Sequence, residues 1–238
     1  ADGGLIQRVS NVVLTALRPR ELDPGPPPGL WREERTTAAR GDRLFRDVLV
    51  VIDGAESGWR ALEQVALLAR HEETRAHGIH VVPSDASLDG ARDVVEAFSD
   101  HLQRWDLEGE LTVRAGDFEA EVAALARWTD LVVAASRPPE SQGDDRPLGG
   151  GVRGILGPSP QPVLVVPGTP TGLERAVLAY DGSAKADEAL FVATYAAAEW
   201  GVEVTVVTAH ERTRQGQQIL KRACRYLSER GVGGRASA

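Results

Sequence analysis

Two Asp-Gly pairs, Asp53-Gly54 and Asp181-Gly182, each follow a run of apolar residues in this chain of 238 residues. A carboxylate at the end of a buried strand can accept hydrogen bonds from a ribose or from the edge of a base. The same carboxylate can equally cap a helix or shape the turn between strand and helix. Both interpretations stay open for Asp53. For Asp181 we expect turn geometry more than ligand contact, because no loop that could hold phosphates follows it.

Ser136-Arg137 and the run Gly149-Gly150-Gly151 are the other residues that could bind an anion. The Arg137 guanidinium could pair with a phosphate or with the nearby Asp144 and Asp145. The three glycines form either a cradle for phosphate or a slack stretch of loop. A short helix is expected from about residue 149, and the free N–H groups at a helix N-terminus favour phosphate.

Residues that would indicate catalysis are not arranged for it. The five histidines show no metal-ligand spacing on one helix face, and no nucleophile elbow, Cys/His pair or complete P-loop occurs. The chain is therefore not expected to be an enzyme or to hold a metal. The single cysteine, Cys224, cannot form an internal disulfide and is expected to be buried and inert, which fits a reducing cytoplasm. Four tryptophans are expected to be packing residues: Trp59, Trp105, Trp128 and Trp200.

Residues 44–168 alternate short apolar runs with helical patterns. The expected strands are 48–52, 79–82, 110–114, 131–135 and 162–166. The expected helices are 57–70, 88–107, 117–128 and the short one after 149. Strands that alternate with helices form parallel units, so we predict a doubly wound α/β domain with a five-stranded parallel sheet. The continuous apolar run at 48–52 is expected to be the central, nearly fully buried strand.

The same pattern begins again after Pro170. Asp181-Gly182 follows Asp53-Gly54 at an offset of 128 residues (53 to 181), which indicates tandem duplication. The expected strands of the second copy are 176–180 and 202–207, and the expected helices are 184–200 and 211–230. Nothing after Gly231 resembles the third to fifth strands. Residues 173–231 are therefore a β-α-β-α half repeat. Either the chain is truncated, or another copy or another chain completes the half repeat. Its strands are expected to add to the sheet of a partner or to pack on the first domain.

Residues 1–43 lie before the first copy. Residues 5–17 have the pattern of an amphipathic helix, which could be the tail of a preceding similar domain. A proline-rich stretch at 23–29 follows and is expected to be an extended linker.

The charge and hydropathy of the chain exclude two classes of partner. The net charge is −8 and the sequence pI is about 5.2, so the surface repels the phosphate backbone of nucleic acid. No apolar run approaches the ~20 residues that a membrane span needs, and no signal peptide is evident. The sequence therefore predicts a cytoplasmic protein that binds neither nucleic acid nor membrane.

Five segments carry a resemblance to the universal stress protein family. They are VLVVIDG at 48–54, TDLVVAASR at 129–137, PVLVVP at 162–167, VLAYDGS at 177–183 and the overlapping YDGSAKADEAL at 180–190. The resemblance covers 44–168 fully and 173–231 as a half repeat. It implies the adenine nucleotide alpha hydrolase-like fold, with strand order 3-2-1-4-5. Many members of the family bind ATP and dimers are usual, so ATP is the candidate ligand. A homodimer, or pairing with another universal stress domain, is the expected assembly.

The family's nucleotide signature is degraded in this chain. The family pattern is Gly-x-x-Gly, nine residues, then Gly-Ser or Gly-Thr. By spacing from Arg137 its positions fall on Pro138, Ser141 and Gly151, and by helix register from Pro162 the final pair falls on Gly149-Gly150. On either alignment the first two glycines and the hydroxyl are missing. Three prolines remove N–H donors and two aspartates add negative charge: Pro138, Pro139, Pro147, Asp144 and Asp145.

Three functions remain open on the sequence. The leading one is a non-catalytic stress-response or regulatory module with a degenerate nucleotide site and weak or no ATP binding. The second is an ATP-binding sensor that uses the crevice where the strand order reverses, formed by Asp53, Ser136, Arg137 and the three glycines. The third, a nucleotide hydrolase, has no identifiable general base or metal ligand to support it.

Overall fold

The computed structural model describes residues 43–83, 91–136, 154–157, 159–209, 213–233 and 235–236. The expected helix at 5–17, Arg137 and the glycines 149–151 lie outside these residues. The described residues divide into two compact units, residues 43–170 and residues 171–236. Among the described residues, no helix is long and apolar enough to cross a membrane.

The first unit contains a five-stranded sheet in the order β3-β2-β1-β4-β5, and every pair in it is parallel. The strands are β1 (Asp47–Val51), β2 (Arg75–Val82), β3 (Glu108–Ala115), β4 (Leu131–Ala135) and β5 (Val163–Val166). The predicted fold class and strand order are confirmed. The run 48–52 is central and buried as expected, with Val48, Leu49 and Val50 all 0% exposed.

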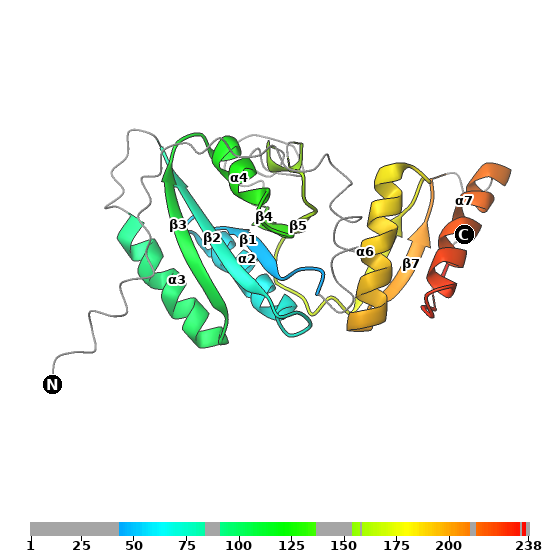
Figure 1. The fold of residues 1–238 in the computed structure, drawn as a ribbon, viewed down its shortest axis with the longest axis horizontal. Coiled ribbons are helices and arrows are strands. Elements are labelled where there is room, and N and C mark those ends of the chain that lie inside the picture. The colour runs from blue at the N-terminus through cyan, green and yellow to red at the C-terminus, as the bar shows by residue number, and fades with distance from the viewer. Residues whose placement is uncertain are drawn as a thin grey trace. The chain divides into compact units, whose positions relative to one another are not determined.

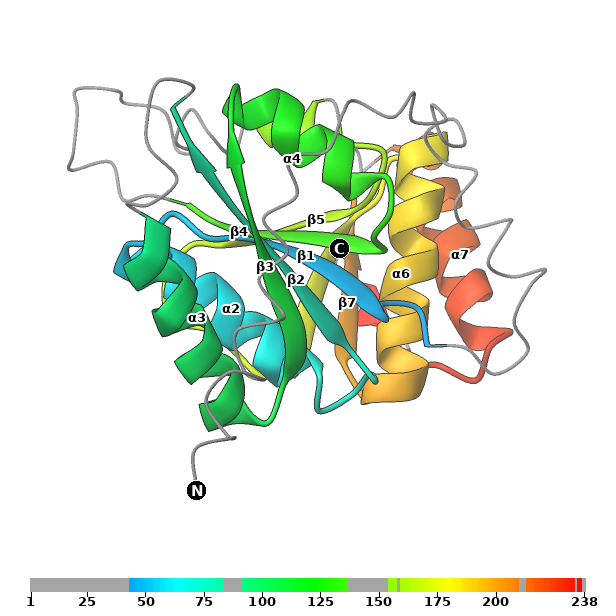
Figure 2. The same ribbon diagram turned by 60° about the vertical axis from the view of Figure 1, so that its left-hand side comes forward.

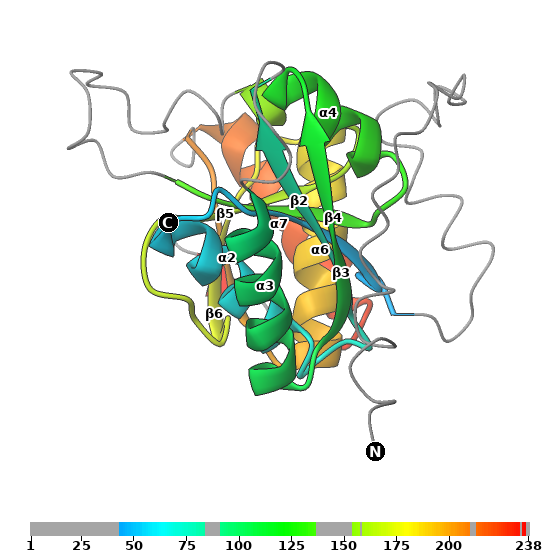
Figure 3. The same ribbon diagram turned by 90° about the vertical axis from the view of Figure 1, so that its left-hand side faces the viewer.

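Helices cover both faces of this sheet (Figures 2 and 3). Helices α2 (Glu56–Leu68) and α3 (Arg92–Trp105) lie on one face and α4 (Phe118–Ala126) lies on the other. On the α4 face, Val122 and Ala126 join a buried cluster with Leu49 and Ile79 of the sheet. The sheet is therefore apolar on both sides, which explains the continuous apolar run of β1.

The second strand begins four residues earlier than the sequence pattern predicts, at Arg75 instead of residue 79. Its first half includes Gly78, which is buried beneath α3. A Cβ added to Gly78 would lie 2.7 Å from both Leu111 Cδ1 and Phe98 Cε2. The position requires glycine for its lack of volume, so the apolar pattern that marks a strand is interrupted there.

Two expectations about single side chains are wrong. Trp128 is not a packing residue, because it is 62% exposed two residues beyond the end of α4. Cys224 is half-buried instead of fully buried. The other tryptophans do pack: Trp59 and Trp105 stack with His101, and Trp200 lies against the core of the second unit.

The second unit contains a parallel sheet in the order β6-β7-β8. Figure 1 labels α6, β7 and α7 of this unit. Its elements are β6 (Arg175–Ala179), α6 (Ala184–Trp200), β7 (Glu203–Val207), α7 (Arg214–Ser228) and β8 (Arg235–Ala236). The expectation that nothing after Gly231 resembles a third strand is wrong, because β8 pairs with β7 there. This strand is only two residues long and has no apolar run, so its backbone pairing leaves no pattern in the sequence.

The two copies share their backbone pairing as well as their motif. The N–H of Ile52 donates to the carbonyl of Ile79 at 2.9 Å, and Tyr180 donates to Val207 at 2.8 Å. Both residues of the second bond follow those of the first by the same offset of 128 residues, as do the Asp-Gly pairs (52 to 180, 79 to 207). The register of β6 on β7 therefore repeats that of β1 on β2.

Candidate functional site: the carboxyl edge of the first sheet

Asp53 and Ser136 lie at the ends of two neighbouring strands. Strand β1 pairs with β4 in parallel, with Val50 opposite Val133, and the chain reaches Asp53 and Ser136 shortly after each strand ends. The connections from these two strands run to opposite sides, since β2 follows β1 and β5 follows β4 in the order 3-2-1-4-5. This is the switch point at which open α/β sheets bind ligands.

The Asp53 carboxylate is occupied by its own turn. Its Oδ1 accepts hydrogen bonds from the backbone N–H of Ala55 at 3.0 Å and of Gly58 at 3.1 Å. Its Oδ2 accepts from the Ser57 hydroxyl at 2.8 Å. Three donors from the start of α2 thus hold a side chain that the sequence left open between ligand contact and turn geometry. The turn also needs Gly54, whose φ of +77° is in the left-handed region.

Gly58 was not recognised as part of this site from the sequence. It is buried in the first turn of α2, and a Cβ there would lie 2.6 Å from Asp53 Oδ1 and 2.9 Å from the backbone N of Asp53. A side chain at this position would displace the carboxylate from the helix end. A small residue five positions after the aspartate is the signal that could have identified it.

Asp53 caps helix α2 in place of the N-cap residue. The N-cap residue of α2 is Ala55, which makes no side-chain capping bond. The N–H of Gly58, three residues into the helix, is the group that an N-cap side chain normally satisfies. Asp53 reaches forward from two residues before the cap and accepts that bond instead.

In the second unit the N-cap residue itself caps the corresponding helix, α6. Its cap residue is Ser183, whose Oγ accepts from the N–H of Ala186 at 3.2 Å. Asp181 Oδ1 accepts from the N–H of Ser183 at 2.8 Å. Hydrogen bonds from the Ser183 hydroxyl and then from its N–H lower the pKa of the Asp181 carboxyl. Asp181 therefore supports the turn, and no described strand pairs with the free edge of β6 beside it.

His80 lies at the end of β2 next to this turn. Its Nδ1 is 2.7 Å from the carbonyl oxygen of Ile52, the residue before Asp53. Because a carbonyl only accepts, Nδ1 carries the proton and donates, and in the neutral ring Nε2 is an acceptor. The sequence treated His80 as one of several scattered histidines. Only the pairing of β1 with β2 brings it to the carboxyl edge.

Ser136 is half-buried and is held at the edge by its backbone. Its N–H donates to the carbonyl of Val166 at 3.0 Å, which ties the end of β4 to the end of β5. Arg137 and the glycines 149–151, which would complete the phosphate half of the site, lie outside the described residues. The structure therefore brings together Asp53, Ser136 and His80, and Asp181 belongs to the other unit.

An acidic side chain lies where the chain emerges from the glycine-rich segment. Gly154 lies in a short helical turn. A Cβ at this position would collide with the carboxylate of Glu119, which lies in the first turn of α4. The carboxylate therefore packs directly on the Gly154 backbone. Among the described residues, no group of His, Cys, Asp and Glu could hold a metal ion that would neutralise such charge.

The sequence itself matches no family model and no curated protein. The structure, however, resembles solved universal stress proteins. A universal stress protein from Archaeoglobus fulgidus DSM 4304 superposes with a TM-score of 0.69 at 18% identity, covering 82% of this chain and 77% of that one. This coverage is larger than either unit alone.

Two structures from Pseudomonas aeruginosa are also similar. One is a protein of unknown function from strain PAO1, with a TM-score of 0.58 at 17% identity, covering 82% of this chain and 74% of the other. The second, from strain UCBPP-PA14, is provisionally named a universal stress protein and has a TM-score of 0.58 at 18% identity, covering 82% and 75%. At such identities the likeness establishes the fold, and the fold of this chain is that of universal stress proteins.

Proposed function

We propose that this chain is a non-catalytic universal stress protein, a stress-response or regulatory module whose nucleotide site binds ATP weakly or not at all. The observation that carries the proposal is that the Asp53 carboxylate already accepts three hydrogen bonds from the residues that follow it. A ligand that used this carboxylate would compete with the donors of Ala55, Ser57 and Gly58. Each hydrogen bond to a charged group is worth roughly 1.5–3 kcal/mol, so the competition is costly.

Two further features disfavour a triphosphate. The Glu119 carboxylate lies against Gly154, close in the chain to the expected phosphate cradle. Like charges repel, so this exposed side chain opposes an anion there. In the loop itself the sequence has lost two glycines and a hydroxyl, and has gained Asp144 and Asp145. Losing two or three charge-assisted bonds would weaken binding by several powers of ten, at about 1.4 kcal/mol per tenfold.

The second candidate is an ATP-binding sensor at the same edge. The adjacency of the β1 and β4 ends favours it, since Asp53 and Ser136 remain beside a switch point of the type that binds nucleotides. In its neutral form the His80 ring, with Nδ1 bonded to Ile52, would offer an acceptor at Nε2 to an exocyclic amino group. In this version Asp53 would contact the ribose or base with the lone pairs that its turn leaves over.

Isothermal titration of ATP into the purified chain separates the two candidates. The proposal expects no saturation below millimolar ATP, and equally little binding by the Asp53→Ala and Ser136→Ala variants. Micromolar affinity that is lost in Asp53→Ala and kept in the matched variant Asp181→Ala would establish the sensor. Production of ADP or AMP on incubation with ATP, followed by chromatography, would contradict the non-catalytic assignment.

The expected assembly is a homodimer or a pairing with another universal stress domain, in a cytoplasmic setting without nucleic acid or membrane. Support comes from the net charge of −8 and from a half repeat that cannot bury both faces of its sheet by itself. Sedimentation velocity over a range of concentrations tests the oligomeric state, and a strictly monomeric chain would contradict it.

A further inference from the structure

Helices α3 and α7 hold equivalent places in the two units. Each follows the second strand of its unit and leads into the third. His77 pairs with Glu110 across β2 and β3, and Thr205 pairs with Arg235 across β7 and β8. The first members of these pairs differ by 128 positions (77 to 205) and the second members by 125 (110 to 235). The third strands therefore align at an offset of 125 residues.

The ends of the two helices share this offset. Beyond α3 the N–H of Leu107 donates to the carbonyl of Leu102 at 3.0 Å, and beyond α7 the N–H of Val232 donates to Leu227 at 3.1 Å. Donors and acceptors both differ by 125 positions (107 to 232, 102 to 227). The residue before each donor has a left-handed φ in both units. Positions of α3 and α7 can therefore be compared one by one.

Three charged positions on α3 have the opposite charge at the equivalent positions of α7. Residues four apart lie on the same side of a helix, so each set of three forms one row. The members, all exposed, are Glu96, Asp100 and Arg104 in the α3 row and Lys221, Arg225 and Glu229 in the α7 row, which ends on the C-cap of α7. Among the described residues, no ion pair or side-chain hydrogen bond engages any of the six.

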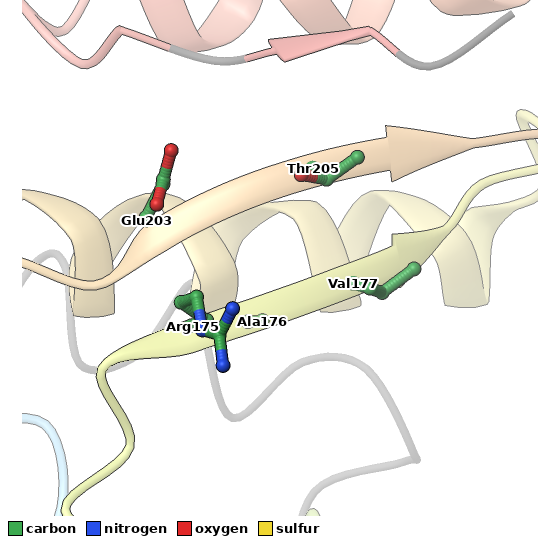
Figure 4. Close-up of a pocket in the computed structure, with 5 residues that line it drawn as sticks. All are labelled: Arg175, Ala176, Val177, Glu203 and Thr205. Atoms are coloured by element: carbon green, nitrogen blue, oxygen red, sulfur yellow. The ribbon is translucent and has the colours of Figure 1, made fainter.

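The α7 row is separate from the uncovered side of its own sheet. Figure 4 shows that side, a hollow of about 400 Å³ with α6 behind the strands. Its lining residues are Arg175, Ala176, Val177, Glu203 and Thr205. In the first unit α4 covers the corresponding side, and the α3 row is nevertheless exposed. The exposure of the α7 row therefore does not depend on what covers the hollow.

The charges of the two rows match in one relative direction. If the helices lie side by side and parallel, every residue of the α3 row meets its equivalent, and a carboxylate meets a cation at all three positions. If they lie antiparallel, Glu96 meets Glu229 and Arg104 meets Lys221, so two of the three contacts are repulsive. A helix face that only contacts solvent needs no particular sign of charge, whereas complementary charges fix the register of two surfaces and exclude wrong alignments.

We propose that the α3 row of one chain binds the α7 row of a second copy of the chain, with the two helices parallel. The net charge of −8 opposes the approach of two copies, so the basic residues of α7 are a favourable place for contact. Exposed ion pairs contribute little singly, so the association is weak and falls as salt screens the charges. The inference specifies a surface for the assembly proposed above and rests on that assembly.

Exchange of charges between the rows is the test, followed by sedimentation velocity of the full chain at low ionic strength. Lys221→Glu with Arg225→Glu makes the α7 row acidic like the α3 row. Glu96→Lys with Asp100→Lys makes the α3 row basic like the α7 row. Each double variant should weaken self-association by about tenfold, because attraction becomes repulsion at two positions. The chain with all four substitutions should associate as the unaltered chain does, since its rows are complementary again.

A matched control separates the rows from net charge. Lys185→Glu with Arg127→Glu also replaces one lysine and one arginine at exposed positions, but outside both rows. This control should associate as the unaltered chain does. An equimolar mixture of the two double variants should associate as well, because each supplies the charge that the other lacks. Circular dichroism checks that every variant is folded.

Three outcomes would overturn the inference. A monomer at every concentration would contradict both the proposed assembly and the contact between the rows. A dimer that neither double variant weakens would leave the assembly standing and exclude this contact. Loss of association in Lys221→Glu with Arg225→Glu that the fourfold variant does not restore would assign the α7 row to a different acidic surface. None of these readouts involves ATP, so they are independent of the proposed nucleotide site.

Discussion

Asp53 accepts a hydrogen bond from the backbone N–H of Gly58 at 3.1 Å, three residues into a helix whose own cap residue, Ala55, offers no side-chain acceptor. The second copy has Ser183 in the place of Ala55 and caps its helix with it. The aspartate of the first Asp-Gly pair therefore caps the helix, whereas the aspartate of the second pair bonds only within the turn.

This difference predicts the stability of Asp53→Ala. The variant should lower the free energy of unfolding by about 1 kcal/mol, the usual worth of a helix cap. Adding Ala55→Ser should recover most of the loss, because the new hydroxyl can accept from Gly58. Urea unfolding of the single and double variants measures both effects. If Ala55→Ser stabilises the unaltered chain as much as it stabilises Asp53→Ala, the shared capping role is excluded.

His101 should make stability depend on pH. Its ring stacks between Trp59 and Trp105, at centroid distances of 4.8 and 4.9 Å, and its buried Nδ1 has no hydrogen-bond partner among the described residues. Burial, and then the Arg104 charge, lower the pKa of His101 from its usual 6.5. The unfolded chain then binds the proton more readily, so this contribution to stability is complete above pH 6.5 and is lost as pH falls through the lowered pKa.

Thermal unfolding between pH ~5 and ~8 measures this dependence. The His101→Phe variant keeps an aromatic ring between the two tryptophans and should flatten the curve in that range. His71→Phe serves as the control, and its curve should keep the acid decline. An unchanged acid decline in His101→Phe would assign the titration to another group.

Gly78 should not tolerate a side chain. The methyl group of Gly78→Ala would lie 2.7 Å from Phe98 Cε2 and from Leu111 Cδ1, in a packed layer between β2 and α3. Overpacking of this kind costs about 1–3 kcal/mol, which denaturant unfolding can resolve. The control is Gly168→Ala, where nothing lies within 4 Å of the added Cβ. A Gly78→Ala variant as stable as that control would mean that α3 can move away from the sheet.

Tyr180 should ionise only at high pH. Burial, and then its hydroxyl bond to Asp187 at 2.6 Å, raise the pKa of Tyr180 to about 12 from the usual 10. Because the unfolded chain ionises first, stability is fully present below pH 10 and is lost between pH 10 and about 12. Ultraviolet absorbance of phenolate follows the titration directly. Asp187→Asn removes the carboxylate that opposes ionisation and should move the transition to lower pH, whereas Lys185→Gln should not.

Strands buried on both faces could be predicted from the sequence alone. Strand 131–135 was predicted at the residues where it lies, and the run 48–52 is central, because a parallel strand covered by helices must be apolar at every position. The offset of 128 residues between the two Asp-Gly pairs could also be read from the sequence, and the pairing of β6 with β7 follows that of β1 with β2 by the same offset. The start of β2 and the two residues of β8 could not be predicted from the sequence, because glycine and backbone pairing leave no apolar pattern.

For the site, the sequence determined which residues end the strands, and therefore that Asp53 and Ser136 meet at the switch point. Only the tertiary structure decided which groups the Asp53 carboxylate contacts. Its carboxylate could have faced a ligand or its helix, and the choice depends on Gly58 leaving room and on Ala55 lacking an acceptor. The tertiary structure also placed His80 beside Asp53 and left Val177 bare, because strand pairing and helix coverage join residues that are distant in the chain.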